Sequence, residues 1–277
     1  MRALVIGGGT MGRGIAQLFA QRGHEVLLAD ADEARTAAAL DAVTASLARA
    51  VERGRLTADE ADAARRRVFV DDGSRVELAI EAVPEEIALK RSVLAELDRR
   101  LPEREPLATN TSSLSIDALA EGLYHRHRLV GMHFFNPAVA MPLVEIVRGS
   151  ATDDGIVERV RELAVALGKE PIVVRDSPGF ATSRLGVLLG LEAARMLEEG
   201  VASAADIDRA MELGYGHPMG PLRLGDLVGL DVRLAISQDL ERELGPRFAA
   251  PAILRELVAA GHLGKKSGRG FYEWPAS

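Results

Sequence analysis

The stretch Ala3-Leu4-Val5-Ile6-Gly7-Gly8-Gly9-Thr10-Met11-Gly12 decides the fold, because it joins an apolar run directly to a Gly-x-Gly-x-x-Gly loop. We expect residues 3–8 to form a buried strand. Apolar residues then recur at helical spacing through Met11–Arg22, which predicts a helix. A glycine-rich turn between a strand and a helix is typical of a fold that binds a dinucleotide at the helix N-terminus.

Each glycine of the loop has its own task if the loop binds a dinucleotide. Gly7 permits the tight turn, Gly9 lets the backbone approach the pyrophosphate, and Gly12 allows the helix to pack closely on the strand. The free N–H groups of the first helical turn would then face the phosphates, with Thr10 and Met11 beside them. We therefore expect all five residues in the cofactor site.

Asp30 follows a second apolar run, Glu25–Ala29, which predicts a second strand. A carboxylate at this strand end can bind both hydroxyls of the adenosine ribose, and it would repel a 2′-phosphate. The sequence therefore predicts NAD rather than NADP as the cofactor. Two alternatives stay open, because Asp30 could simply begin a turn and Arg35 is close enough in sequence to affect the choice.

Helices and strands continue to alternate as far as residue 174, which is typical of a doubly wound, mostly parallel α/β sheet of the Rossmann type. Two of the expected helices, within residues 32–67, form an inserted helical pair. The expected helices are 32–52, 57–67, one opened by Pro84, one from about Ile116, and 154–167. The expected strands are 68–70, 78–83, 107–109, 129–135, 143–147 and 171–174.

Beyond Pro178-Gly179 the pattern changes, since no strand-like run appears again. Helical periods are found at 184–199, 205–213, 222–243 and 252–260. The sequence therefore predicts a dinucleotide-binding domain over residues 1–182 and an all-α domain over residues 183–277.

Composition argues against several classes of protein. The 277-residue chain has a net charge of −7 and a pI near 5.5, which disfavours a nucleic-acid-binding surface. The chain has no cysteine and its six histidines lack trustworthy metal-ligand spacing, so we expect neither disulfides nor a metal site. No apolar stretch reaches the roughly 18 residues of a membrane span, and the N-terminus lacks a signal-peptide pattern. We therefore expect a cytoplasmic protein without membrane or nucleic-acid partners.

A candidate base lies in Gly131-Met132-His133-Phe134-Phe135-Asn136-Pro137, and Glu145 follows His133 by twelve residues. Imidazole has an unperturbed pKa of about 6.5, so it can take up a proton near neutral pH. A neighbouring carboxylate could hold the ring in one tautomer and stabilise the imidazolium. The segment Asn110-Thr111-Ser112-Ser113 also lies at a predicted strand end, where ligands bind in open α/β sheets. The alternative is a core histidine and a solvated glutamate.

These segments resemble the 3-hydroxyacyl-CoA dehydrogenase family, and most closely its bacterial 3-hydroxybutyryl-CoA dehydrogenases. The resemblance follows the family's order and covers both predicted domains. The matching segments are Gly7–Ala16, Ile80–Glu85, Asn110–Leu114, His133–Pro137, Asp176–Phe180, His217–Pro221 and Gly264–Tyr272.

The resemblance implies a reversible, NAD-dependent oxidation of short-chain (S)-3-hydroxyacyl-CoA to 3-oxoacyl-CoA. His133 would remove the proton of the substrate 3-hydroxyl while hydride passes to the nicotinamide. Glu145 would pair with His133, and Ser112 would form a hydrogen bond to the reacting oxygen.

Further contacts to the cofactor are implied at Glu85, Lys90, Asn110, Asn136 and Lys266. Local alternatives remain for two of these residues. Glu85 could complement a helix N-terminus, and Lys90 could lie on a solvated helix face.

The inserted helical pair is where the family receives coenzyme A. Ser46 matches a contact position, and Arg53 stands where a lysine is usual; either cation could meet a phosphate. Ser112 would contact the same substrate. Without the resemblance, we would interpret Arg49 and Arg53 as ordinary helix surface.

The C-terminal helical domain would close over the substrate and form a homodimer, as in the family. Its first helix carries an apolar stripe that exceeds what a simple core contact needs, although a buried core is the alternative. The stripe consists of Leu185, Leu188, Leu189, Met196 and Leu197.

Ser183 departs from the family pattern, which has an asparagine at this position as a fourth polar residue of the active site. Serine keeps a donor and an acceptor but lacks the amide fork. The departure leaves two other hypotheses open: a dehydrogenase of a non-CoA hydroxy substrate such as gulonate or carnitine, and a weakly active or non-catalytic NAD-binding relative.

Overall fold

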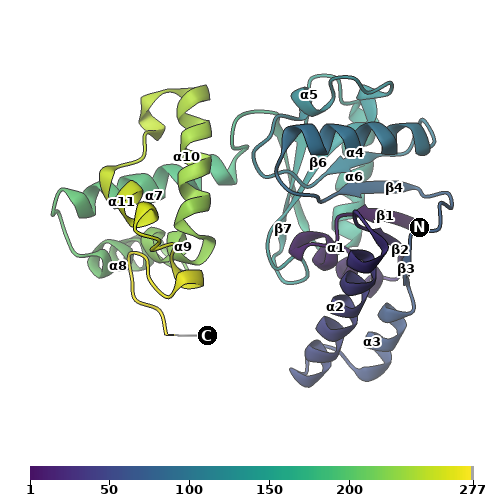
Figure 1. The fold of residues 1–277 in the computed structure, drawn as a ribbon, viewed down its shortest axis with the longest axis horizontal. Helices are drawn as coiled ribbons and strands as arrows, with labels where there is room; N and C mark the ends of the chain where they lie inside the picture. The colour runs from purple at the N-terminus through teal and green to yellow at the C-terminus, as the bar shows by residue number, and fades with distance from the viewer. Residues whose placement is uncertain (276–277) are drawn as a thin grey trace. The chain divides into compact units, whose positions relative to one another are not determined.

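The computed structural model describes residues 1–275. The chain forms two compact units, which divide between Ser177 and Pro178 (Figure 1). The predicted domain boundary after residue 182 falls just inside the first helix of the second unit, which begins at Thr182. Among the described residues, no helix is long and apolar enough to cross a membrane.

The first unit contains eight strands: β1 (Arg2–Ile6), β2 (Glu25–Ala29), β3 (Val68–Val70), β4 (Leu78–Glu81), β5 (Leu107–Thr109), β6 (Leu129–Phe134), β7 (Leu143–Arg148) and β8 (Glu170–Arg175). They form one sheet in the order β3-β2-β1-β4-β5-β6-β7-β8. All neighbours are parallel except β6 and β7. This confirms the predicted doubly wound sheet, whose strand order changes direction between β1 and β4, where such sheets bind ligands.

The helices of the first unit are α1 (Thr10–Gln21), α2 (Glu33–Glu52), α3 (Ala58–Arg65), α4 (Ile87–Arg100), α5 (Ile116–Leu119) and α6 (Asp154–Ala166), with a short 3₁₀ turn at Arg126–Arg128. The inserted pair is α2 and α3. The predicted capping box of α3 is present, because Thr57 and Glu60 exchange hydrogen bonds between side chain and backbone.

The prediction that Pro84 opens a helix was wrong, since α4 begins at Ile87. The backbone N–H of Glu86 bonds back to the carbonyl of Pro84, and the N–H of Val83 donates to the Glu81 carboxylate. The segment is therefore a turn, held by Glu81, that delays the helix by three residues.

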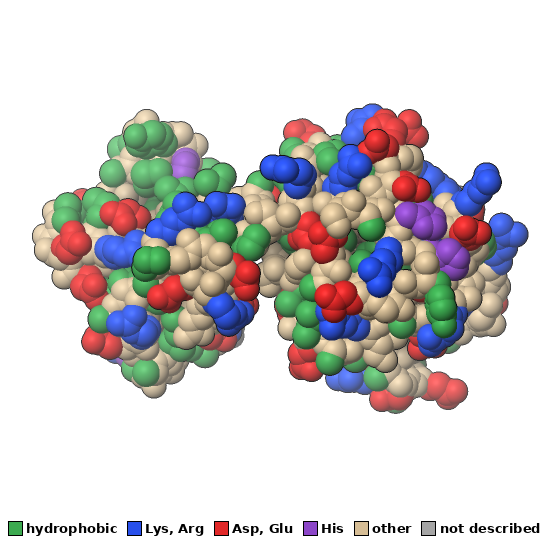
Figure 2. All heavy atoms as spheres, turned by 90° about the horizontal axis from the view of Figure 1, so that it is seen from above, with side chains coloured by type: hydrophobic (Ala, Val, Ile, Leu, Met, Phe, Trp, Pro, Cys, Tyr) green, Lys and Arg blue, Asp and Glu red, His purple; other side chains and the backbone are tan. Residues whose placement is uncertain are grey.

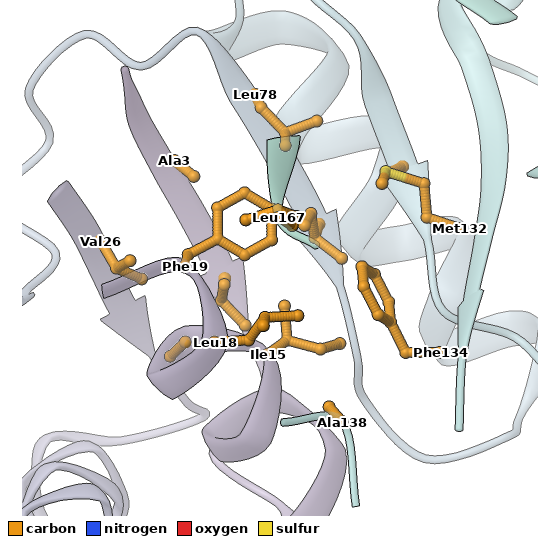
Figure 3. Packing of buried hydrophobic residues seen from close by; sticks show 14 of the residues in the cluster. Ala3, Ile15, Leu18, Phe19, Val26, Leu78, Met132, Phe134, Ala138 and Leu167 are labelled. Atoms are coloured by element: carbon orange, nitrogen blue, oxygen red, sulfur yellow. The ribbon is translucent and has the colours of Figure 1, made fainter. Parts of the chain in front are cut away.

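One hydrophobic core of the first unit lies on the face of the sheet that α1 and α6 cover, and buried residues of α4 and α5 pack on the other face. Phe19 of α1 lies among strand residues Ala3, Val26 and Leu78, and all four are almost completely buried (Figure 3). Burying side chains of this size against β1, β2 and β4 fixes the position of α1 on the sheet. This packing fixes where the glycine loop before α1 must lie.

The second unit is helical, with α7 (Thr182–Glu198), α8 (Ala204–Tyr215), α9 (Pro221–Val228), α10 (Leu230–Leu244) and α11 (Ala252–Ala259), and 3₁₀ turns at Pro246–Phe248 and Lys265–Ser267. The prediction of one helix over 222–243 was wrong. Gly229 has φ +108°, which is outside the helical region, and it separates α9 from α10. Apolar periodicity continues across the break, so the pattern alone could not reveal it.

Two buried carboxylates tie the second unit together. Asp208 accepts hydrogen bonds from the first backbone N–H groups of α9 and from the Tyr272 hydroxyl. Asp226 accepts from the backbone of Phe271 and Tyr272 and from the Trp274 indole. These bonds fasten the C-terminal segment to α8 and α9.

Candidate active site

The glycine loop has the geometry expected of a dinucleotide site. Gly7 has φ +110°, and a Cβ there would lie 2.6 Å from the carbonyl oxygen of Ala82. A Cβ at Gly12 would lie 1.7 Å from the carbonyl oxygen of Gly7, so α1 packs directly on the turn. A Cβ at Gly9 would meet nothing within 4 Å. Gly7 and Gly12 are therefore required by the protein itself, whereas the space beside Gly9 is open to a ligand.

Asp30 is held at the end of β2 by backbone donors. Its Oδ2 accepts from the Gly8 N–H at 2.6 Å and its Oδ1 from the Ala31 N–H at 2.7 Å. Arg35 Nη1 lies 3.7 Å from Oδ1, on a side chain that is 68% exposed. The carboxylate is thus tied to the glycine loop, and Arg35 reaches it only loosely.

A cleft of about 760 Å³ runs along these residues. Its walls combine the glycine loop, including Thr10 and Met11, with Asp30 on one side and apolar residues of α4 on the other. The α4 residues are Leu89, Val93 and Leu97. An apolar wall opposite a carboxylate suits a purine ring and its ribose, so the residues present fit the adenosine half of NAD.

His133 and Glu145 face each other across the antiparallel pair β6 and β7, where they are register partners. The Nδ1 of His133 lies 2.7 Å from Oε2 of Glu145. Glu145 is fully buried and His133 is 7% exposed. A carboxylate at this distance holds the imidazole proton on Nδ1, which makes Nε2 the basic nitrogen.

Glu85 organises the serine-rich turn that follows β5. Its Oε1 accepts from the Thr111 hydroxyl at 2.6 Å and from the backbone N–H groups of Ser112 and Ser113 at 2.9 and 3.0 Å. The Ser112 hydroxyl lies 3.2 Å from the same oxygen. Burial opposes ionisation of Glu85, but Lys90 and these hydrogen bonds outweigh it and lower the pKa of the carboxyl. Glu85 therefore serves this turn and not a helix N-terminus.

Lys90 lies inside the protein, so the interpretation as a solvated helix face was wrong. The side chain is 1% exposed, and its Nζ donates to Glu81 Oε1 at 2.7 Å and to the Val83 carbonyl at 3.1 Å. Glu85 Oε2 lies 3.3 Å from the same nitrogen. The sequence analysis did not single out Glu81, although a charged residue at the end of the apolar strand Leu78–Glu81 is the signal that could have found it.

Asn110 joins three strands. Its backbone N–H donates to the Glu81 carbonyl at 2.8 Å, and its side-chain oxygen accepts from the Phe134 N–H at 2.9 Å. The Asn110 amide therefore holds the end of β5 to the end of β6, beside His133.

A second groove contains Ser46 of α2 and Arg53, the residue that follows this helix. It consists of two adjoining hollows of about 500 and 240 Å³, which share Gln17, Ser46, Arg49, Pro137 and Val139. Asn136 and Thr10 line the smaller hollow, and Thr10 also lines the cofactor cleft. The groove therefore leads from the glycine loop along α2.

Four arginines line this groove, of which the sequence analysis proposed only Arg53; the others are Arg13, Arg49 and Arg55. Within residues 1–275, no carboxylate lies within ion-pair distance of any of the four. On the face shown in Figure 2, basic side chains are instead interspersed with acidic ones. Four unpaired cations in one groove of an acidic protein indicate a polyanionic ligand.

Lys169 fixes the wall of the groove opposite α2. Its buried ammonium donates to the carbonyls of Ala138 and Met141 at 2.6 and 2.8 Å. Burial lowers the pKa of Lys169, with a smaller effect from Arg22. The loop that carries Pro137 and Val139 is therefore pinned at both ends.

The remaining predicted residues lie in the second unit. Ser183 is the second residue of α7. Lys266, in the 3₁₀ turn Lys265–Ser267, has its Nζ 2.6 Å from Asp231 Oδ2.

The strand order, the glycine loop and the strand-end Asp30 define a dinucleotide-binding protein of the Rossmann type. Comparison with family models gives two matches: residues 2–177 match the 3-hydroxyacyl-CoA dehydrogenase NAD-binding domain, and residues 179–274 match the C-terminal domain of the same family. The chain therefore belongs to the 3-hydroxyacyl-CoA dehydrogenase family, a family of NAD-dependent oxidoreductases, and NAD is its cofactor.

Individual relatives agree with this assignment. The chain is 42% identical over 280 residues to a 3-hydroxybutyryl-CoA dehydrogenase of Mycobacterium tuberculosis, covering 99% of this chain and 98% of the relative. It is 41% identical to the 3-hydroxyadipyl-CoA dehydrogenase of Escherichia coli, of whose length it spans 58%. The crystal structure of M. tuberculosis FadB2 superposes with a TM-score of 0.94, at 42% identity and 99% coverage of both chains.

Two alanine substitutions in the loop separate its structural and binding roles. Gly12→Ala should lower the free energy of unfolding by about 1–3 kcal/mol, because its methyl group collides with backbone. Gly9→Ala should leave unfolding unchanged but weaken NADH binding at least about tenfold, since the methyl group would occupy the approach of the pyrophosphate. Urea unfolding and NADH fluorescence titration measure the two effects. Equal NADH affinity in Gly9→Ala and the wild type would contradict this division.

Proposed function

We propose that this protein catalyses the reversible NAD-dependent oxidation of short-chain (S)-3-hydroxyacyl-CoA to 3-oxoacyl-CoA. The observation that carries the proposal is the buried pair of His133 and Glu145 on the same sheet as the dinucleotide loop. The family membership and the named substrates of the relatives support it.

In the proposed mechanism His133 Nε2 accepts the proton of the substrate 3-hydroxyl. Glu145 holds the other ring proton of His133 on Nδ1 and stabilises the imidazolium that forms. Ser112, presented by the turn that Glu85 holds, forms a hydrogen bond to the reacting oxygen. The glycine loop and Asp30 would hold NAD⁺, which when bound would supply the acceptor for the hydride from C3 of the substrate. In the reverse direction, His133 returns the proton to the oxygen.

The arginine groove supports a coenzyme A substrate over a small hydroxy acid. Coenzyme A carries a diphosphate and a 3′-phosphate at the far end of a long pantetheine arm. The groove starts beside the glycine loop and holds Ser46, Arg49 and Arg53 on one face of α2, since they are spaced by three and four residues. Gulonate or carnitine would leave these cations unused.

We also propose that the second unit mediates a homodimer. Part of the predicted apolar stripe is core, because Leu188, Met196 and Leu197 pack in the interior clusters of the unit. Leu185 and Leu189, however, are 61% and 43% exposed. Exposed leucines on a helix beside a complete core favour a contact with a second copy.

The first test of the function is NADH oxidation with acetoacetyl-CoA. We expect turnover that requires the CoA moiety and prefers NADH, with free acetoacetate and NADPH as comparisons. His133→Ala should lower kcat/KM by about 10²–10⁴-fold, the usual contribution of a general base. Absence of turnover with NADH binding intact would overturn the proposal and favour a non-CoA substrate or a binding role.

The effect of the serine at position 183 is tested by restoring the family residue. If Ser183 costs one positioning hydrogen bond, worth about 1–3 kcal/mol, Ser183→Asn should raise kcat/KM by about 5- to 150-fold. Steady-state kinetics across acyl chains of increasing length measure this. Unchanged kcat/KM for every chain length would show that Ser183 does not weaken catalysis.

The groove is tested by comparing two thioesters. The double variant Arg49→Ala/Arg53→Ala should raise KM for acetoacetyl-CoA at least about tenfold, because it loses two charge-assisted contacts to phosphate. KM for acetoacetyl-pantetheine, which lacks the nucleotide, should not change. Arg66→Ala, on the surface of α3 and paired with Asp62, is the matched control. An equal rise for both thioesters would contradict phosphate recognition by the groove.

A further inference from the structure

Glu81 and Lys90 form an ion pair in the interior of the first unit, at the end of β4. Glu81 is fully buried and Lys90 is 1% exposed, and their Oε1 and Nζ atoms are 2.7 Å apart. Glu81 also accepts from the Val83 N–H and the Thr109 hydroxyl, each at 2.7 Å. An apolar pair of similar volume is often as stable as a buried ion pair, so stability alone does not explain this one.

The ammonium of Lys90 connects the pair to Glu85. Two hydrogen bonds, to Glu81 and to the Val83 carbonyl, use two of its three N–H groups. Its remaining close partner is Glu85 Oε2, at 3.3 Å. The ammonium is therefore held by three groups of the protein itself.

Glu85 in turn holds the turn that presents Ser112. Only one of its oxygens, Oε1, collects the donors of Thr111, Ser112 and Ser113. The other oxygen is held by Lys90. Glu85 is therefore held at both oxygens, by the turn at Oε1 and by Lys90 at Oε2.

We propose that Glu81 and Lys90 are positioning residues that act through Glu85 to fix the Asn110–Ser113 turn, and so place Ser112 against the reacting oxygen. This inference rests on the proposed function. Lys90, which the family resemblance assigns to the cofactor, thereby also acts on the substrate side through Glu85. The pair also ties the end of β5, since Thr109 donates to Glu81.

The test compares substrate turnover with cofactor binding. The double variant Glu81→Gln/Lys90→Met removes both buried charges together, so neither is left unpaired and the protein should fold. We expect kcat with acetoacetyl-CoA to fall by about ten- to a hundredfold, because small displacements of positioned groups cost rates of this order. The Kd for NADH should change by a smaller factor than kcat does. Arg99→Met, on the exposed last turn of α4, is the control and should change neither quantity.

A cycle with Ser112→Ala separates positioning from general damage to the structure. If the pair acts through Ser112, adding the double substitution to Ser112→Ala should cause little further loss of kcat. Losses that multiply would overturn the proposal, because the pair would then act independently of Ser112. A tenfold weaker NADH affinity with unchanged kcat would also overturn it, because the pair would then act on the cofactor alone.

Turnover by the wild type distinguishes failure of the positioning role from failure of the proposed function. An active wild type whose kcat is unaffected by the double substitution refutes the positioning role and leaves the proposed function standing. A wild type that does not turn over acetoacetyl-CoA overturns both.

Discussion

The hydrogen bonds that tie one strand end to the next along the carboxyl edge of the sheet are the constraint on which the site depends. Gly7 bonds to Ala29, Ala82 to Ile6, and Asn110 to Glu81, so β2, β1, β4 and β5 are fastened in succession. The Asn110 side chain extends the row to β6. Every side chain proposed for cofactor or proton chemistry in the first unit stands on or next to this row, which is why loops of unrelated sequence keep fixed relative positions.

Local pattern was enough to predict much of the fold. The alternation of apolar runs with amphipathic segments predicted the sheet, and the bounds of β2 agree with the prediction to the residue. It failed where a contact distant in sequence or a single φ angle decided the outcome. The Glu81 carboxylate delays α4 past Pro84, and Gly229 interrupts an apolar period that would otherwise predict one helix.

The residues of the candidate site likewise divide into those that a local motif reveals and those that only the folded structure reveals. Asp30, His133 and Glu145 could be proposed because each lies in a short motif whose chemistry is visible in the motif itself. Glu81 and Arg49 could not, since their significance comes from partners brought together by folding: Lys90 for the first and the wall at Pro137 for the second. The burial of Lys90 was likewise invisible, because lysine on a helix is usually solvated.

Acidic and basic side chains of the candidate site have different surroundings. Carboxylates near the proposed chemistry each accept hydrogen bonds from the protein, and Glu81 and Glu145 are fully buried whereas Glu85 is partly exposed. Within residues 1–275, the arginines of the α2 groove have no acidic partner at ion-pair distance. A chain with a net charge of −7 thus has a local cluster of positive charge where an anion can bind.

The antiparallel pairing of His133 with Glu145 has a consequence for how this protein can evolve. The two residues are register partners, and their neighbours Val144 and Ile146 point to the opposite side of the sheet. A shift of the pairing between β6 and β7 by a single residue would put an aliphatic side chain opposite the imidazole. The segment 135–142 between the two strands lines the α2 groove and is pinned by Lys169. Descendants of this chain are therefore free to change that loop when they acquire new substrates, but not the register of the two strands that flank it.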